Sequence, residues 1–139
     1  MGSVSNIKTC VTQLGTVGSD LNFFIFEAPE QCHIESIYIV TGTTKAADNS
    51  NYATVTIKNL GVGGAGTITV ATSSNNAAGL ILTADVPKAF VMSTTAAYHE
   101  VAVGEVLQAQ VDVSVAGTCT FGAETAIIVN WVPGTGSGQ

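Results

Sequence analysis

Two histidines, each with a glutamate close by in the sequence, are the residues best suited to acid–base or metal chemistry in this chain. His33 and Glu35 are two positions apart, which places both side chains on one face of a strand, as two metal ligands would require. His99 directly precedes Glu100, so a base adjoins a carboxylate. A metal site needs a third and usually a fourth donor, and the spacing implies none. Neither histidine has a Gly-x-Ser-x-Gly nucleophile context. We therefore expect surface or interfacial histidines, with no catalytic residue and no metal.

The glycine cluster Gly61–Gly66 (GVGGAG) superficially resembles a phosphate-binding loop. It lacks the lysine of a Walker A motif, and no helix is expected after it, as a dinucleotide fingerprint requires. The ten acidic residues show no informative grouping, and the chain has no DxDxDG calcium loop. We predict a loop between two strands, no cofactor and no enzymatic activity.

Three cysteines, Cys10, Cys32 and Cys119, lie far apart in the sequence. An odd count without a CxxC pair fits reduced thiols made in a cytosol. We expect small apolar residues in core positions. A cysteine pair and, less favoured, a zinc site remain as alternatives.

Charged residues are scarce, because the chain has four lysines, no arginine and ten acidic residues among 139. They make up 10% of the chain, against about 25% in a typical domain, and 46% of the chain is apolar. The net charge of −6 and the scattered lysines argue against binding to nucleic acid or to an anionic membrane. The N-terminus lacks the apolar segment of a signal peptide, and the longest charge-free stretch is rich in Gly, Thr, Ser and Asn. Such a chain must cover itself with neutral polar residues or with another protein, which predicts a subunit of an assembly.

The elements that position these residues read as β-strands. Period-2 alternation with one apolar face predicts half-buried strands at Asn51–Leu60, Gly66–Thr72 and Glu105–Val115. Other segments are apolar on both faces, which predicts a second covering layer, either the chain's own loops or a partner; these are Asn22–Glu27, Ile37–Val40 and Ala126–Val132.

Turn signals separate about eight or nine strands, counting an early one near Ile7–Thr12 and weaker ones at Ala89–Ser93 and Tyr98–Val103. This pattern predicts an all-β sandwich or barrel. We expect an N-terminal arm or first strand over residues 1–19, one domain over residues 20–133, and a flexible tail over residues 134–139.

Two segments resemble the jelly-roll domains of tailed-bacteriophage structural proteins, especially capsid decoration (cement) proteins. Ser93–Gly134 resembles their closing hairpin, with a Val-Ala-Val-Gly-Glu-Val-Leu step and a last strand that ends in Trp-Val-Pro. Phe26–Gly61 resembles their Ala-Pro step into an Ile-rich strand, followed by an Asn-Tyr-x-Thr-Val strand. The resemblance implies a jelly-roll sandwich of about eight antiparallel strands in two sheets. It also implies a homotrimer on the capsid exterior, made in the host cytoplasm, that contacts the major capsid protein and stabilises the shell without catalytic residues.

The apolar strands supply the candidate contact residues, which are Phe23, Phe24, Phe26, Ile127, Val129 and Trp131. One face of each strand should serve the core and the other a neighbour, with Val129 taken as an outward member. The alternative function is a tail-fibre or spike tip that binds a receptor or carbohydrate by stacking on Trp131, Tyr38, Tyr52 or Tyr98. A cupin-like or glycosidase-like enzyme is the weakest alternative, since two distant histidines are too few for a cupin metal site.

Overall fold

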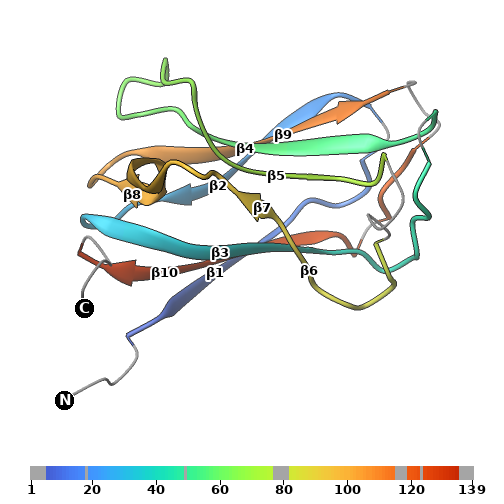
Figure 1. The fold of residues 1–139 in the computed structure, drawn as a ribbon, viewed down its shortest axis with the longest axis horizontal. Helices are drawn as coiled ribbons and strands as arrows, with labels where there is room; N and C mark the ends of the chain where they lie inside the picture. The colour runs from blue at the N-terminus through green and yellow to red at the C-terminus, as the bar shows by residue number, and fades with distance from the viewer. Residues whose placement is uncertain are drawn as a thin grey trace.

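Two antiparallel β-sheets pack face to face in the computed structural model of the chain, which describes residues 6–17, 19–48, 50–76, 82–114, 119–122 and 124–134 (Figure 1). The β1 sheet has the strand order β1 (Lys8–Gln13), β10 (Ala126–Pro133), β3 (Cys32–Val40) and β6 (Lys88–Ala89), with β8 (Glu100–Val101) also paired to β3. The β2 sheet has the order β2 (Leu21–Glu27), β9 (Val106–Val113), β4 (Ala53–Asn59), β5 (Ile68–Ser74) and β7 (Val91–Met92).

The order of the strands is that of a jelly roll. The chain passes from one sheet to the other between β1 and β2, β2 and β3, and β3 and β4. It returns to the β1 sheet at β6 and finishes with β9 in one sheet and β10 in the other. Each of the main strands pairs antiparallel with its neighbours, so the prediction of a two-sheet antiparallel jelly roll is confirmed.

The weakly predicted strands at Ala89–Ser93 and Tyr98–Val103 form a broken border instead of one continuous strand. β6 pairs with β3, the next two residues of β7 pair with β5 in the other sheet, and β8 then pairs with β3. Between β7 and β8 lies a single 3₁₀ turn, η1 (Ala96–His99), which contains Tyr98. The chain therefore crosses between the sheets and closes this side of the sandwich (Figure 1).

The opposite side begins with β1, which pairs along its whole length with β10, from Lys8 opposite Trp131 to Gln13 opposite Ala126. Of the two options for the N-terminal region, arm or first strand, residues 8–13 are thus a strand. Most of the expected tail, residues 135–139, lies outside the described part of the chain.

The core lies between the inner faces of the sheets. Strand β4 alternates buried and half-buried residues at every position, and β9 does so over most of its length, as the period-2 pattern predicts. The largest fully buried side chains come from both sheets and include Ile34, Ile37, Ile39, Ile57, Leu107, Phe121 and Ile127. In the described ranges, no helix is long and apolar enough to cross a membrane.

Candidate functional site

Strand parity decides which apolar residues are available to a partner. In β10, Ile127, Val129 and Trp131 point into the core, and Ile128 and Val132 lie half-buried on the outer face. The expectation that Val129 points outward is therefore wrong. Its side chain is 1% exposed, because alternation along β10 turns it to the core beside the fully buried Ile37 of β3.

The bulge in β2 divides the three predicted contact phenylalanines among three environments. The pairing of β2 with β9 shifts between Phe24 and Phe26, so Ile25 is the extra residue. Phe26 is buried and packs against the Trp131 ring, with 5.5 Å between centroids, and Phe23 is half-buried. Phe24 is 69% exposed and, with Phe26, Glu27 and Val106, lines a shallow hollow at the border of the β2 sheet.

The outer face of the β1 sheet carries an apolar row that crosses its three long strands. Val11 in β1 lies opposite Ile128 in β10, which lies opposite Tyr38 in β3. Val11 is 56% exposed, and the other two are half-buried. The row continues to the exposed Ala89 in β6, so it spans the width of the sheet.

A hydrogen-bonded polar row runs beside this apolar row. The Thr9 hydroxyl donates to Asn130 Oδ1 at 2.8 Å, and Asn130 Nδ2 donates to the Ser36 hydroxyl oxygen at 3.1 Å. The two rows together form the neutral patch, which we define as Thr9, Val11, Ser36, Tyr38, Ile128 and Asn130. No formal charge lies among these six residues, and the polar ones partly satisfy one another, which lowers the cost of removing them from water.

A histidine–carboxylate cluster lies at the end of the same face, where β8 pairs with β3. His33 Nδ1 lies 2.5 Å from Glu100 Oε2, and His33 Nε2 lies 3.5 Å from Glu35 Oε2. The His99 ring meets the His33 ring edge-on at 5.6 Å, and its Nε2 lies 2.8 Å from the Ser93 carbonyl oxygen. The fold thus brings together both histidine–glutamate pairs that the sequence singled out.

This cluster consists of histidine–carboxylate contacts that join β3 to β8. Glu100 Oε1 is buried without a hydrogen-bond partner, so only one oxygen of this carboxylate is engaged by the protein. In the described part of the chain, no group of three or more His, Cys, Asp or Glu side chains is placed to hold a metal ion. The cluster ties β8 to β3, and it lacks a neighbouring nucleophile motif.

The cysteines are free thiols in three different places. Cys10 is half-buried in β1, and Cys32 and Cys119 are buried. Burial, reinforced by the charge of Glu100 and of two further glutamates, raises the pKa of the Cys32 thiol to about 11. A thiol with so high a pKa is protonated near neutral pH and is a poor nucleophile or metal ligand.

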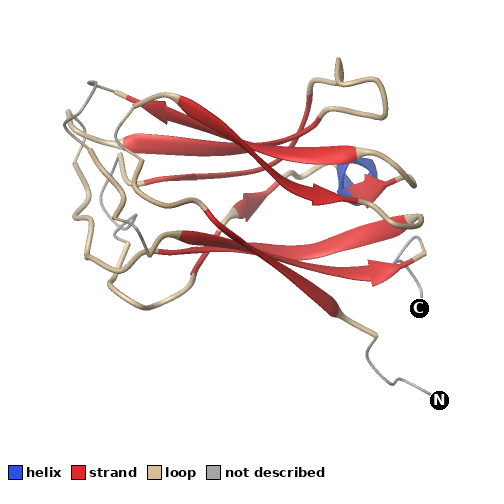
Figure 2. Ribbon diagram, turned by 180° about the vertical axis from the view of Figure 1, so that it is seen from behind, coloured by secondary structure: helices blue, strands red, loops and turns tan. Residues whose placement is uncertain are grey.

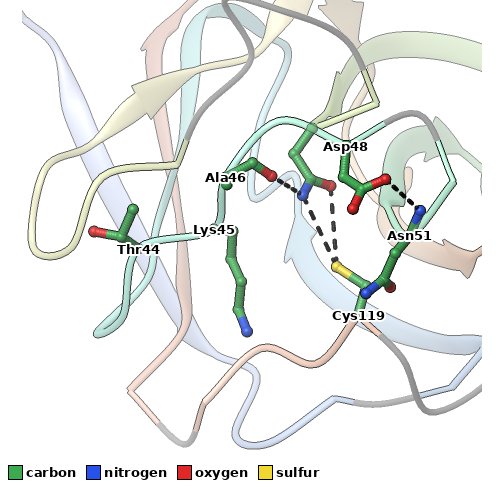
Figure 3. A pocket seen from close by; sticks show the side chains of 7 residues that line it. Thr44, Lys45, Ala46, Asp48, Asn51 and Cys119 are labelled. Atoms are coloured by element: carbon green, nitrogen blue, oxygen red, sulfur yellow. Dashed lines mark hydrogen bonds between the residues drawn. The ribbon is translucent and has the colours of Figure 1, made fainter.

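A small polar pocket lies at the end of the sandwich, where the loop before β4 meets Cys119 (Figure 3). Asn75 Nδ2 donates to the Ala46 carbonyl at 2.9 Å, and Asp48 Oδ1 accepts from the backbone N–H of Asn51 at 3.0 Å. Burial raises the pKa of the Cys119 thiol, and the Lys45 ammonium opposes part of that rise. The Asn75 amide thus fastens the loop to the residues after β5, and Asp48 braces the loop internally; Asn51 Oδ1 is buried without a partner.

The aromatic residues proposed for sugar stacking come from different elements of the fold, and the largest of them is buried. Trp131 is 6% exposed, because it packs on Phe26 and lies under the Lys8 ammonium at 5.9 Å from the ring centroid. The three tyrosines come from separate segments, Tyr38 in β3, Tyr52 before β4 and Tyr98 in η1. The burial of Trp131 removes the residue best suited to stack on a sugar.

The sequence carries one signal for the neutral patch, the polar residue Asn130. Asn130 is the one polar residue in an otherwise apolar strand, and a polar side chain marks the solvent side of a half-buried strand. Because side chains alternate, Ile128 and Val132 share its side, and Val129 and Trp131 take the other. The partners Val11 and Tyr38 depend on strand register, which the sequence alone does not reveal.

No protein-family model matches this chain, and no curated protein matches it. Among solved structures, the chain is similar to one in the structure of infectious bursal disease virus, Gx strain, with a TM-score of 0.40 and 14% sequence identity. The alignment covers 91% of this chain and 32% of that one, so this chain spans about a third of the length of that protein.

Proposed function

We propose that the protein is a structural, non-enzymatic virion protein that binds the outer surface of a capsid as a homotrimer and stabilises the shell. The observation that carries the proposal is the neutral patch on the outer face of the β1 sheet. It presents an exposed or half-buried apolar row and an internally bonded polar row on three adjacent strands.

A surface of this kind suits a broad protein contact. Burying an unpaired charge at an interface is costly, and the buried centres of interfaces are depleted of charged residues. An uncharged sheet face avoids that cost, and the sheet holds its side chains in fixed positions. The same scarcity of charge gives the chain little means of binding nucleic acid electrostatically.

The experiment combines light scattering with capsid binding. The purified chain is added to capsids assembled from the major capsid protein of the same virus, and the mixture is sedimented and imaged by electron cryomicroscopy. We expect a trimer in solution, co-sedimentation, and added density with three-fold symmetry on the capsid exterior. A chain that is monomeric at micromolar concentration and stays in the supernatant would contradict the proposal.

Two matched variants locate the contact. Ile128→Glu places a charge in the neutral patch, and we expect it to abolish trimer formation or capsid binding. Gln110→Glu places the same charge on the outer face of the β2 sheet, where Gln110 is half-buried, and we expect it to leave both intact. Equal losses in the two variants would exclude the neutral patch as the contact.

A further inference from the structure

The outer edge of β1 is an unpaired strand edge. In the described residues, β1 pairs only with β10, and it forms the border of its sheet (Figures 1 and 2). The Leu14 N–H donates to the Thr125 carbonyl at 2.8 Å, which fixes the phase of this ladder. Antiparallel pairs alternate between bonded and non-bonded, so the backbone groups of Lys8, Cys10 and Thr12 face β10.

The backbone N–H and C=O groups of Thr9, Val11 and Gln13 consequently face away from the sheet. All three residues are exposed. Unpaired backbone donors and acceptors at the spacing of a strand edge bind another extended strand.

This edge lacks the protection that other borders of the sandwich have. The β2 border carries a bulge at Ile25, and the far side is closed by the chain as it crosses from β6 to β7. Proline, charged side chains and bulges are the usual means of blocking an edge. β1 has no proline, and its pairing with β10 runs without a register shift; Lys8 is its only charged residue.

We propose that β1 pairs antiparallel with β1 of a second copy of this chain, around a two-fold axis at Val11. In this register Val11 lies opposite the partner's Val11, and Thr9 lies opposite the partner's Gln13. Each facing pair of residues exchanges two backbone hydrogen bonds. The two β1 sheets then form one continuous sheet.

Charge and surface continuity favour a second copy as the occupant. The one charge on β1 is the cation of Lys8 at its start, and in the proposed register this residue lies away from the two-fold axis at Val11. The segment from Thr9 to Gln13 has no charge that would oppose itself across the axis. The apolar row from Tyr38 through Ile128 to Val11 continues into the same row of the partner, which is the self-complementary match that a two-fold contact requires.

The pairing goes beyond the proposed function and stands independently of it. An edge pair needs neither a three-fold contact nor a capsid. Within a trimeric assembly it would join chains of neighbouring trimers.

Disulfide trapping tests the register. Facing residues of a bonded antiparallel pair have Cα atoms about 5.5 Å apart, which is within the range that a disulfide spans. We expect Val11→Cys to form a disulfide-linked dimer under mild oxidation. Chains with Thr9→Cys and chains with Gln13→Cys should cross-link when mixed, and neither should do so alone. Val91→Cys is the control: Val91 is 69% exposed, against 56% for Val11, but it lies in β7, and the variant should remain monomeric on a denaturing gel.

A second variant tests the backbone bonds directly. Because the Val11 N–H faces away from β10, Val11→Pro removes an edge donor without removing a bond of the β1–β10 ladder. We expect a fall of tenfold or more in the association constant of the two-fold contact, about 1.4 kcal/mol, with β-type circular dichroism unchanged. The proposal is overturned if folded Val11→Cys chains give no cross-link, or if the Thr9→Cys and Gln13→Cys chains fail to cross-link when mixed. Cross-linking without capsid binding would instead overturn only the proposed function.

Discussion

At the scale of single residues, the two sides of β10 should respond in opposite ways to the same substitution. Val129 is buried opposite Ile37, so Val129→Glu places a carboxylate in the core, and we expect a loss of more than about 4 kcal/mol of unfolding free energy. Ile128 lies half-buried on the outer face, so Ile128→Glu should cost the isolated chain less than about 1 kcal/mol. Urea unfolding followed by circular dichroism measures both values. Similar losses of unfolding free energy in the two variants would show that Val129 and Ile128 do not lie on opposite faces of β10.

The Cys32 thiol predicts a dependence of stability on alkaline pH. Its pKa is raised to about 11, mainly by burial, from an ordinary value of 9.0. Between these two values the unfolded chain has lost the thiol proton and the folded chain retains it, so the unfolded state binds fewer protons. Stability therefore falls as pH rises from about 9 to about 11. Below pH 9 both states are protonated and the thiol contributes no slope.

Comparison with Cys32→Ala isolates this contribution from every other pH-dependent group. We expect the unfolding free energy of the variant to decline less steeply with pH between 9 and 11, whatever its absolute level. Thermal melts at half-unit pH steps provide the measurement. Parallel curves for the two proteins would mean that the Cys32 thiol titrates alike in both states.

At the scale of elements, side chains from β1 close the open corner of the sandwich onto the bulge in β2. The Thr12 hydroxyl donates to the Ile25 carbonyl at 3.2 Å, and the Cys10 thiol donates to the same oxygen at 3.4 Å. The bulge leaves this carbonyl oxygen free to accept these side chains. Two side-chain donors and one backbone carbonyl thus join the two sheets at this corner, where no ladder of backbone hydrogen bonds connects the described residues.

Thr12→Val should loosen that corner without unfolding the chain. The variant keeps the shape of the side chain and loses the hydroxyl donor, so we expect a cost of about 1 kcal/mol and faster amide hydrogen exchange in β1. Thr9→Val is the matched control, because its hydroxyl bonds to Asn130 at the exposed face and its loss should cost less. Faster exchange in the Thr9 variant than in the Thr12 variant would contradict the assignment.

The strands differ in how well the sequence predicts them. Alternation predicted β4 and β9 with their inner faces, because a half-buried strand records its own orientation. The apolar run predicted strand β10, but the prediction that Val129 points outward is wrong, because the polar Asn130 marks the outer side of the strand. The bulge at Ile25 and the crossing from β6 to β7 were beyond prediction, because both arise from pairing with strands distant in the sequence. The cluster around His33 depends on the same long-range pairing, which brings Glu100 beside it.

At the scale of the whole molecule, the scarcity of charge leaves uncharged rows of side chains across the outer faces of both sheets. The outer face of the β2 sheet carries hydroxyl and amide side chains in a row across its strands; these include Asn22, Thr56, Thr72 and Gln110. The neutral patch covers the corresponding part of the β1 sheet. Charged side chains are therefore rare where flat surfaces are available for contact.

Assembly through such surfaces should be insensitive to salt. Ions screen exposed charges beyond about 10 Å at 0.1 M salt, and contacts that depend on charge weaken steeply as the concentration rises. Contacts between neutral faces bury apolar area and backbone hydrogen bonds, which simple salts at moderate concentration affect little. We expect the association constant measured by sedimentation equilibrium to change by less than about threefold, or 0.7 kcal/mol, between 50 and 500 mM sodium chloride. Dissociation at the higher concentration would instead show that the contact depends on charged side chains, and it would remove the neutral patch from the assembly.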